Sequence, residues 1–280
     1  MYVTGGARWM LRLGTGITLA FIYIPLLVIL LYAFNERRVQ TWPIEGLTLE
    51  WFDKAFNNPG VRDALWMSVK AGLGATALAL ILGTLASIAV ARYRFFGRET
   101  ISFLVILPIA LPGIVTGMAL NATFNEVLEP FGVELGLFTI IVGHATFCIV
   151  VVYNNVVARL RRVGGSLEEA SADLGADTWQ TFRLVTLPSL RSAMLAGALL
   201  AFALSFDEII VTTFTAGAEQ TLPIWIYSNI QRPNQVPIVN VVAVLVIILS
   251  MIPVYFAQRL TRERDDEPAL VVATPAAGGH

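Results

Sequence analysis

Residues 166–188 of this chain read SLEEASADLGADTWQTFRLVTLP. The stretch is polar and carries glutamate, aspartate and arginine, whereas the chain on either side of it consists of long apolar runs. A connection that only joined two apolar helices would need a handful of residues. The length and polarity of residues 166–188 therefore predict a structured segment with a role of its own.

The surrounding composition is typical of a membrane protein. Of 280 residues, 56% are hydrophobic and 14% are charged, and the mean hydropathy is +0.70. A soluble protein of this size would carry about 25% charged residues. The net charge of −1 gives no electrostatic reason to expect a nucleic-acid partner. The single cysteine, Cys148, lies inside an apolar run, so we expect a buried structural thiol.

Six apolar segments are long enough to cross a bilayer, which takes about 20 residues of α-helix. We therefore predict an all-α polytopic membrane protein with six transmembrane helices in one domain, residues 1–264. The predicted spans are residues 14–34, 68–91, 101–124, 136–158, 192–216 and 238–258. The first span is interpreted as a retained helix, because it is longer than the core of a usual signal peptide. Residues 265–280 are acidic and then rich in Ala, Pro and Gly, which predicts a disordered tail.

The distribution of arginine and lysine predicts the orientation, because cytoplasmic loops carry an excess of these residues. One side holds both termini and residues 92–99 and 159–191, and has thirteen arginines against five or six basic residues on the other side. Both termini and residues 159–191 are therefore expected in the cytoplasm. The thirteen are Arg8, Arg12, Arg92, Arg94, Arg98, Arg159, Arg161, Arg162, Arg183, Arg191, Arg259, Arg262 and Arg264.

Within residues 166–188 the sequence predicts two short helices joined by a fixed bend. Ser166 is a suitable N-cap, and Glu169 stands three residues later, as a capping box requires. Gly175 suits the left-handed position that ends a helix. Asp177 and Gln180 form a second capping-box pair at the start of the next helix.

The same stretch also predicts an apolar helix face and the point at which the segment ends. Leu167, Ala170 and Leu174 are spaced i, i+3 and i+7, which places them on one helix face. Pro188 lacks a backbone N–H and marks a turn back toward the membrane. Two interpretations stay open on these residues: a loop packed on its own protein, in which Glu169 is only a cap, or a rigid knob for a cytoplasmic partner.

A longer pattern favours the second interpretation. Three residues separate Glu169-Ala170-Ser171 from Gly175, and nine more separate Gly175 from Val185-Thr186-Leu187-Pro188. The pattern resembles the EAA motif of permease subunits of bacterial ABC importers, which reads Glu-Ala-Ala, three residues, Gly, nine residues and Ile-x-Leu-Pro. Ser171 for the second Ala and Val185 for Ile are small departures.

The resemblance implies the type I fold of binding-protein-dependent ABC importer permeases, in a bacterial inner membrane. In that family the first short helix couples the permease to a separate ATP-binding subunit. The implied partners are a second permease, homologous or identical, two ATP-binding subunits, an extracytoplasmic solute-binding protein and membrane lipid. The residues implied in coupling are Glu169, Ala170, Ser171, Gly175, Leu187 and Pro188.

The sequence shows no means of hydrolysing ATP. A phosphate-binding P-loop needs Gly-x4-Gly-Lys-[Ser/Thr], and neither Lys54 nor Lys70 follows a glycine. Since no Ser-His-Asp set, Cys/His cluster or dinucleotide fingerprint is evident either, we predict a transport subunit and not an enzyme. No cofactor or metal is expected in this chain; ATP and Mg would be bound by the partner ATPase subunits.

Two carboxylates lie inside the fifth predicted span. Asp207 and Glu208 mark a pathway by default, because carboxylates are costly in lipid. They follow a row of small residues that suits close helix packing, Ala193, Gly197, Ala201 and Ser205. At about 100° per residue, Asp207 points away from that row and is expected to face the cavity, whereas Glu208 lies nearer to the row. The alternative is that both carboxylates are structural groups near a helix end.

The sequence around these carboxylates also carries a resemblance. Ser205-Phe206-Asp207-Glu208 followed by Thr221-Leu222-Pro223 resembles the branch of the family that serves polyamines, opines and related small molecules. The resemblance favours a spermidine- or putrescine-like solute, for which an anionic wall is suitable. The predicted pathway residues are Asp207, Glu208, Ser205 and Asn121, the last near the outer end of the third span.

The third span contains Pro108, Pro112 and Gly113, which predict a kink. A kink at this place suits a gate, and ordinary packing of a kinked helix is the alternative.

A rival function is a proton-coupled secondary transporter in which Asp207, Glu208 and His144 form a relay. No clear inverted repeat supports it, and residues 166–188 would have no task in such a transporter. His144 is interpreted as a hydrogen-bonded structural residue.

Overall fold

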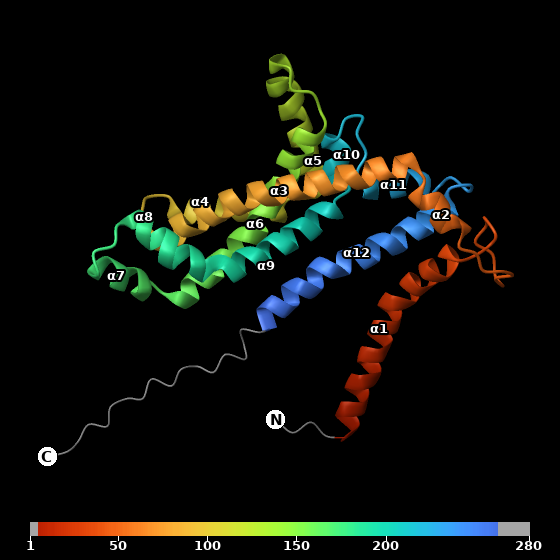
Figure 1. The fold of residues 1–280 in the computed structure, drawn as a ribbon, viewed down its shortest axis with the longest axis horizontal. Coiled ribbons are helices and arrows are strands. Elements are labelled where there is room, and N and C mark those ends of the chain that lie inside the picture. The colour runs from red at the N-terminus through yellow and green to blue at the C-terminus, as the bar shows by residue number, and fades with distance from the viewer. Residues whose placement is uncertain (1–4, 263–280) are drawn as a thin grey trace. The chain divides into compact units, whose positions relative to one another are not determined.

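The computed structural model describes residues 5–262, and the side chains of these residues except 253, 254 and 257–262. This part of the chain is helical and contains no β-strand, apart from one isolated bridge. The elements in Figure 1 are α1 (Gly5–Ala33), α2 (Glu50–Phe56), α3 (Pro59–Arg92), α4 (Arg98–Ala110), α5 (Gly113–Thr123), η1 (Phe124–Leu128), η2 (Glu129–Phe131), α6 (Leu137–Val163), α7 (Ser166–Asp173), α8 (Thr178–Thr181), η3 (Phe182–Thr186), α9 (Leu187–Phe206), α10 (Ile210–Thr215), α11 (Leu222–Asn229) and α12 (Val236–Arg262). The prediction of an all-α protein is confirmed.

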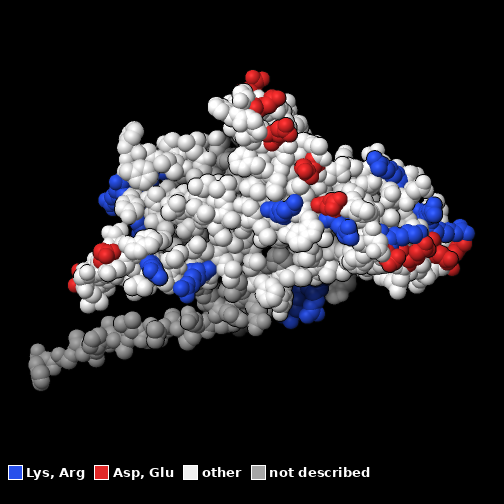
Figure 2. Space-filling model, turned by 45° about the horizontal axis from the view of Figure 1, so that its top comes forward, with Lys and Arg blue, Asp and Glu red and all other residues white. Residues whose placement is uncertain are grey.

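Among the described residues, four helical segments are long and apolar enough to cross a membrane: α1, α3, α6 and the continuous run Thr178–Phe206. A fifth is added if the helices on either side of the break after Ala110 are counted as one span. The sixth predicted span lies in α12, which has 27 residues and a length of about 40 Å at 1.5 Å per residue, but its apolar stretch among the described residues is only Val236–Ile252. The structure is consistent with six crossings, and the number six stays a prediction. Figure 2 shows uncharged surface between groups of charged side chains.

The chain divides into two compact units, each assembled from three separate stretches. Unit 1 holds the described parts of Met1–Ala75, Leu111–Ala145 and Leu204–Met251, and unit 2 those of Thr76–Ala110, Thr146–Ala203 and Ile252–His280. The helices α3, α6, α9 and α12 contribute residues to both units. The intramembrane carboxylates belong to unit 1, and residues 166–188 belong to unit 2.

Tyr153 on α6 joins three helices in the core of unit 2. Its side chain is buried and packs with Val90 of α3 and Val157. Its backbone carbonyl accepts a hydrogen bond from Ser87 Oγ of α3 at 3.1 Å, and its hydroxyl lies 2.7 Å from Ser102 Oγ of α4. Interhelical hydrogen bonds of this kind stabilise helix packing where no water competes.

The row of small residues on α9 packs as predicted. Ala193, Gly197 and Ala201 are all buried. A Cβ at Gly197 would lie 3.2 Å from Val152 Cα on α6, so the absence of a side chain allows the two backbones to approach closely. Cys148 is a buried free thiol that donates to the Ala201 carbonyl at 3.3 Å, as expected for a structural cysteine.

Two predicted spans are interrupted, and the single helix predicted over 192–216 is wrong. The helix α9 ends at Phe206, and α10 begins at Ile210, so the break contains both carboxylates. In the third span the break after Ala110 falls at Leu111 and Pro112, and Pro112 is the N-cap of α5. A proline both fixes φ and disfavours a helical residue before it, which explains why α4 stops there.

The predicted kink is therefore present at Pro112 and Gly113, while Pro108 lies inside α4. Whether this break acts as a gate stays a prediction. The predicted disordered tail, residues 265–280, lies outside the described residues.

Candidate functional site

The first short helix of the predicted knob is α7, and its start differs from the prediction. Its N-cap is Gly165, without a side-chain capping bond, so the predicted capping box of Ser166 and Glu169 is wrong. The Glu169 N–H instead donates to the Gly165 carbonyl at 2.9 Å. The reason is the short connection: Gly164, with φ of +67°, follows the end of α6, and the new helix begins at Ser166. The Glu169 carboxylate is exposed and is therefore not occupied as a cap.

The bend after α7 forms as predicted. Gly175 has a φ of +85°, a conformation that L residues with a Cβ rarely adopt. Its N–H donates to the Ala172 carbonyl at 2.9 Å, and the Ala176 N–H donates to the Ser171 carbonyl at 3.1 Å. This pair of bonds is the Schellman motif, which satisfies the last carbonyls of the helix.

The second short helix, α8, begins with the predicted capping box. Asp177 accepts from the Gln180 N–H at 2.8 Å, and the Gln180 side chain accepts from the Asp177 N–H at 3.0 Å. Across the bend, Ser171 Oγ of α7 lies 3.0 Å from Thr181 Oγ1 of α8. The two helices are thus joined at a fixed angle by backbone and side-chain bonds.

The end of the segment differs from the prediction at Pro188. The chain does not turn there, because Thr178–Phe206 runs as one continuous helix. A π-helical turn, η3, precedes the proline directly. Such a wider turn accommodates a proline ring that would otherwise meet the carbonyl of Leu184. Leu187 and Pro188 therefore lie in the first turn of α9 and are half-buried.

The outer face of α7 is exposed and partly apolar. Leu174 is 89% exposed and Leu167 is 53% exposed, and Ala170 and Glu169 beside them are also exposed. Large apolar side chains left in water on a short, rigid helix indicate a surface for a partner.

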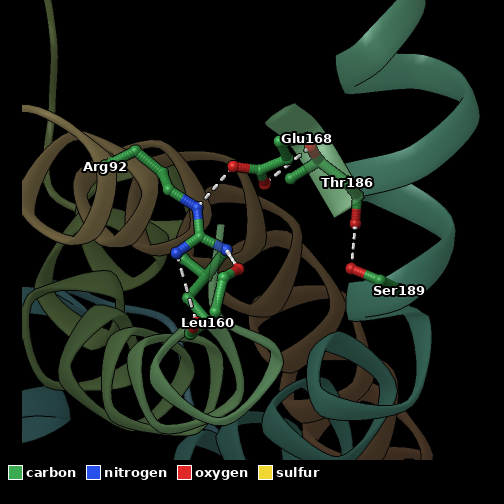
Figure 3. A network of polar contacts seen from close by, with 6 residues as sticks. Arg92, Leu160, Glu168, Thr186 and Ser189 are labelled. Atoms are coloured by element: carbon green, nitrogen blue, oxygen red, sulfur yellow. Dashed lines mark hydrogen bonds and ion pairs between the residues drawn. The ribbon is translucent and has the colours of Figure 1, made fainter. Parts of the chain in front are cut away.

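The inner side of α7 is held by Arg92 and Glu168, for whose contact no local sequence pattern exists (Figure 3). Arg92, the last residue of α3, is ion-paired through Nε with Glu168 Oε2 at 2.7 Å. The other Glu168 oxygen accepts from Thr186 Oγ1 of η3 at 2.9 Å. No spacing rule connects an arginine at the end of one span with a carboxylate that follows the fourth, so sequence patterns gave no signal for this pair.

In unit 1 the two predicted pathway carboxylates have different surroundings. Glu208 Oε1 accepts from the Val211 N–H at 2.9 Å, and Glu208 is half-buried. Asp207 is exposed, and its carboxylate has no hydrogen-bond or ion-pair partner among the described residues. Glu208 thus stabilises the start of α10, while the part of Asp207 in a pathway stays a prediction.

His144 bridges the break that contains these carboxylates. Its Nδ1 lies 2.7 Å from Ser205 Oγ on α9, and its Nε2 lies 2.7 Å from Thr212 Oγ1 on α10. The Thr212 hydroxyl donates its hydrogen to the Glu208 carbonyl at 2.8 Å, so Thr212 Oγ1 accepts a hydrogen bond from the N–H at Nε2 of His144. In this neutral tautomer Nδ1 carries no hydrogen and accepts from the Ser205 hydroxyl. His144 is a buried structural residue, as interpreted, and Ser205, 3% exposed, is occupied by it.

Asn121 lies on α5 and contacts α10. Its Nδ2 donates to the Phe214 carbonyl at 2.7 Å, and its Oδ1 accepts from Asn125 at 3.1 Å. The helices are close enough that a Cβ at Gly117 would lie 2.6 Å from the Phe214 ring. Asn121 therefore joins α5 to α10, and its place in a pathway stays a prediction.

Comparison with known proteins identifies a family and several relatives that this chain resembles. Residues 79–264 match the family model described as "Binding-protein-dependent transport system inner membrane component". The chain is 32% identical over 253 residues to the putrescine transport system permease protein PotI of Escherichia coli (strain K12), covering 87% of this chain and 89% of that protein. It is 33% identical over 248 residues to the spermidine/putrescine transport system permease protein PotC of Haemophilus influenzae (strain ATCC 51907 / DSM 11121 / KW20 / Rd), covering 88% and 94%.

A solved structure shares the fold. It is a bacterial ABC transporter involved in the import of the acidic polysaccharide alginate, with a TM-score of 0.67 and 17% identity, covering 94% of this chain and 99% of that chain. At this identity the likeness shows the fold alone.

Proposed function

Because the chain belongs to the family of binding-protein-dependent transport system inner membrane components, we propose that it works as one half of the translocation path for a polyamine. It is a multi-pass permease subunit of an ABC importer in the inner membrane, a transport component and not an enzyme. We propose that a second, homologous or identical permease completes the path, that two ATPase subunits bind ATP and Mg, and that a solute-binding protein delivers the solute.

The observation that carries the coupling role is the exposed outer face of α7. Leu174 and Leu167 present apolar surface, and Glu169 presents a charge, on a helix whose bend is fixed at Gly175. A rigid helix pair passes on a displacement that a flexible loop would absorb. We propose that an ATPase subunit covers this face, and that residues 159–191 and both termini are cytoplasmic, as the arginine distribution predicts.

The observation that carries the substrate class is the free carboxylate of Asp207. The relatives named for putrescine and spermidine transport cover most of this chain. A polyamine is a flexible polycation, and a carboxylate without an internal partner can pair with one of its amino groups. In a wet cavity such a pair contributes at most a few kcal/mol, because water and the effective dielectric screen it.

The rival function, a proton-coupled secondary transporter, is overturned by the family membership. The geometry agrees, because both ring nitrogens of His144 contact hydroxyl groups, as in a structural histidine.

The test is uptake of putrescine and spermidine into proteoliposomes that contain the intact complex with its ATPase subunits and solute-binding protein. Wild type should take up a polyamine only with ATP. Asp207→Asn preserves shape and removes the charge, so it should lower uptake strongly while the complex still assembles and hydrolyses ATP. Glu208→Gln keeps an acceptor for the Val211 N–H and should lower uptake less. Wild-type uptake by Asp207→Asn would remove the physical support for a polyamine.

A further inference from the structure

Arg92 lies where three helices of unit 2 meet: it is the last residue of α3, and in Figure 3 its guanidinium reaches the end of α6 and the first turn of α7. Besides the ion pair with Glu168, its Nη1 donates to the Leu160 carbonyl at 3.2 Å and its Nη2 to the Gly164 carbonyl at 2.5 Å. The side chains of Arg92 and Glu168 are 18% and 23% exposed, so water has limited access to the pair.

The contacts with Leu160 and Gly164 stabilise the end of α6. The last four carbonyls of a helix have no partner inside it, and positive charge is favourable at that end. The chain leaves α6 through Gly164 in a left-handed conformation and enters α7 two residues later. Arg92 therefore holds both the end of α6 and the start of α7 from the last residue of α3.

Glu168 extends the network to the following helix. It accepts from Thr186 Oγ1 at the end of η3, and Thr186 is buried. The Thr186 carbonyl accepts from Ser189 Oγ at 2.7 Å, and the Ser189 carbonyl accepts from Arg159 Nε at 3.0 Å. One carboxylate thus links the first turn of α7 both to α3 and to the start of α9.

The direction of this carboxylate on α7 matters for the coupling role. Glu168 and Ser171 are the half-buried side of the helix, and both make bonds to neighbouring elements. Glu169 and Leu174 are on the exposed side. The two adjacent glutamates therefore differ in direction: Glu168 points toward the rest of the permease, and Glu169 lies on the exposed side.

We propose that Arg92 and Glu168 are positioning residues for coupling: through Thr186 and the α6 carbonyls they make α7 move as one body with the adjoining ends of α3, α6 and α9. A displacement of α7 by its ATPase partner then reaches three membrane helices together. This proposal rests on the proposed coupling function, and it assigns the transmission step to residues outside the EAA pattern.

The test uses three variants in the reconstituted complex. Glu168→Gln removes the charge that faces Arg92 and leaves an acceptor for Thr186; Thr186→Val removes the bond to η3 only; the double variant removes both. Glu169→Gln is the matched comparison, because it removes the neighbouring charge on the exposed side. The measurements are ATPase subunit bound per permease, ATP hydrolysed, and putrescine taken up.

We expect Glu168→Gln and the double variant to bind the ATPase subunit normally and to hydrolyse ATP, with roughly tenfold less putrescine taken up per ATP, as expected for the loss of an ion pair to which water has limited access. Thr186→Val should lower this ratio less. Glu169→Gln should instead weaken subunit binding. An unchanged ratio in Glu168→Gln and in the double variant would overturn the proposal, whereas a wild-type chain that binds no ATPase subunit would overturn the proposed function.

A second measurement covers variants that fail to assemble. Spin labels at Asp173 on α7 and Arg161 on α6, both exposed, report the distance between these helices in a Cys148→Ser background. The double variant should broaden the distance distribution in the isolated permease, while Glu169→Gln should leave it unchanged. A distribution as narrow as wild type in the double variant would refute the positioning role without reference to activity.

Discussion

Gly175 offers the sharpest test of the bend between α7 and α8. A Cβ built at this residue has no atom within 4 Å, so a replacement meets no neighbour, and any effect must come from the backbone conformation. With φ at +85°, a residue that carries a Cβ costs about 1–2 kcal/mol in that conformation. Gly175→Val should therefore strain the bend without filling any space.

The strain is comparable with what holds the bend. Two backbone bonds and the Ser171–Thr181 contact join the helices there, and each hydrogen bond contributes about 0.5–1.5 kcal/mol net. A strain of about 1–2 kcal/mol removes a large share of that total and lowers the equilibrium ratio of bent to unbent states by a factor of about 5–30. We expect the affinity for the ATPase subunit, and ATP-driven uptake, to fall by up to that factor, because both scale with the fraction of the permease in the bent state.

The assay is binding of the ATPase subunit to purified permease, followed by uptake in proteoliposomes. Gly97 supplies a matched control, because it also has a φ of +85° and open space around its Cβ position, but lies between α3 and α4. Gly97→Val should carry the same local strain and leave subunit binding near wild type. Equal binding by Gly175→Val and wild type, or equal losses in both variants, would refute the assignment of coupling to the bend.

Two further predictions concern topology and the break in the fifth span. A single cysteine at Ala176, in a Cys148→Ser background, should resist impermeant thiol reagents added outside intact cells; labelling from outside would reverse the orientation derived from the arginines. His144→Leu leaves the hydroxyls of Ser205 and Thr212 without their shared partner and should destabilise the fold by about 1–3 kcal/mol. The thermal unfolding midpoint of the His144→Leu variant should fall accordingly. An unchanged midpoint would show that His144 does not stabilise the interrupted part of the fifth span.

Local features were predictable from the sequence because short spacings determine them. The positive φ of Gly175 and the capping pair of Asp177 and Gln180 depend on a few neighbouring residues, and both are present. The spans followed from apolar runs alone. The predicted N-cap at Ser166 is wrong because only two residues separate the preceding helix from Ser166, which local capping patterns do not show.

Tertiary contacts account for what the sequence did not reveal. Nothing in the spacing of Arg92 and Glu168 predicts their ion pair, because it depends on how α3, α6 and α7 meet. The apolar sequence on both sides of Asp207 predicts a continuous helix, whereas the structure has a break between Phe206 and Ile210. It persists because His144, from another helix, supplies a partner for a hydroxyl on each side of it.

The helices that follow the breaks in the third and fifth spans start close together in unit 1. The helices α5 and α10 each begin directly after a break, and their first residues lie together, with the Gly113 Cβ position 3.4 Å from Ile210. Interrupted backbone at membrane depth is tolerated where its polar groups are satisfied or where it lines a water-filled cavity. Glu208 satisfies the Val211 N–H. Asp207 is exposed and has no hydrogen-bond or ion-pair partner among the described residues, so it has no such internal task, and we therefore propose it as the group that contacts a cationic solute.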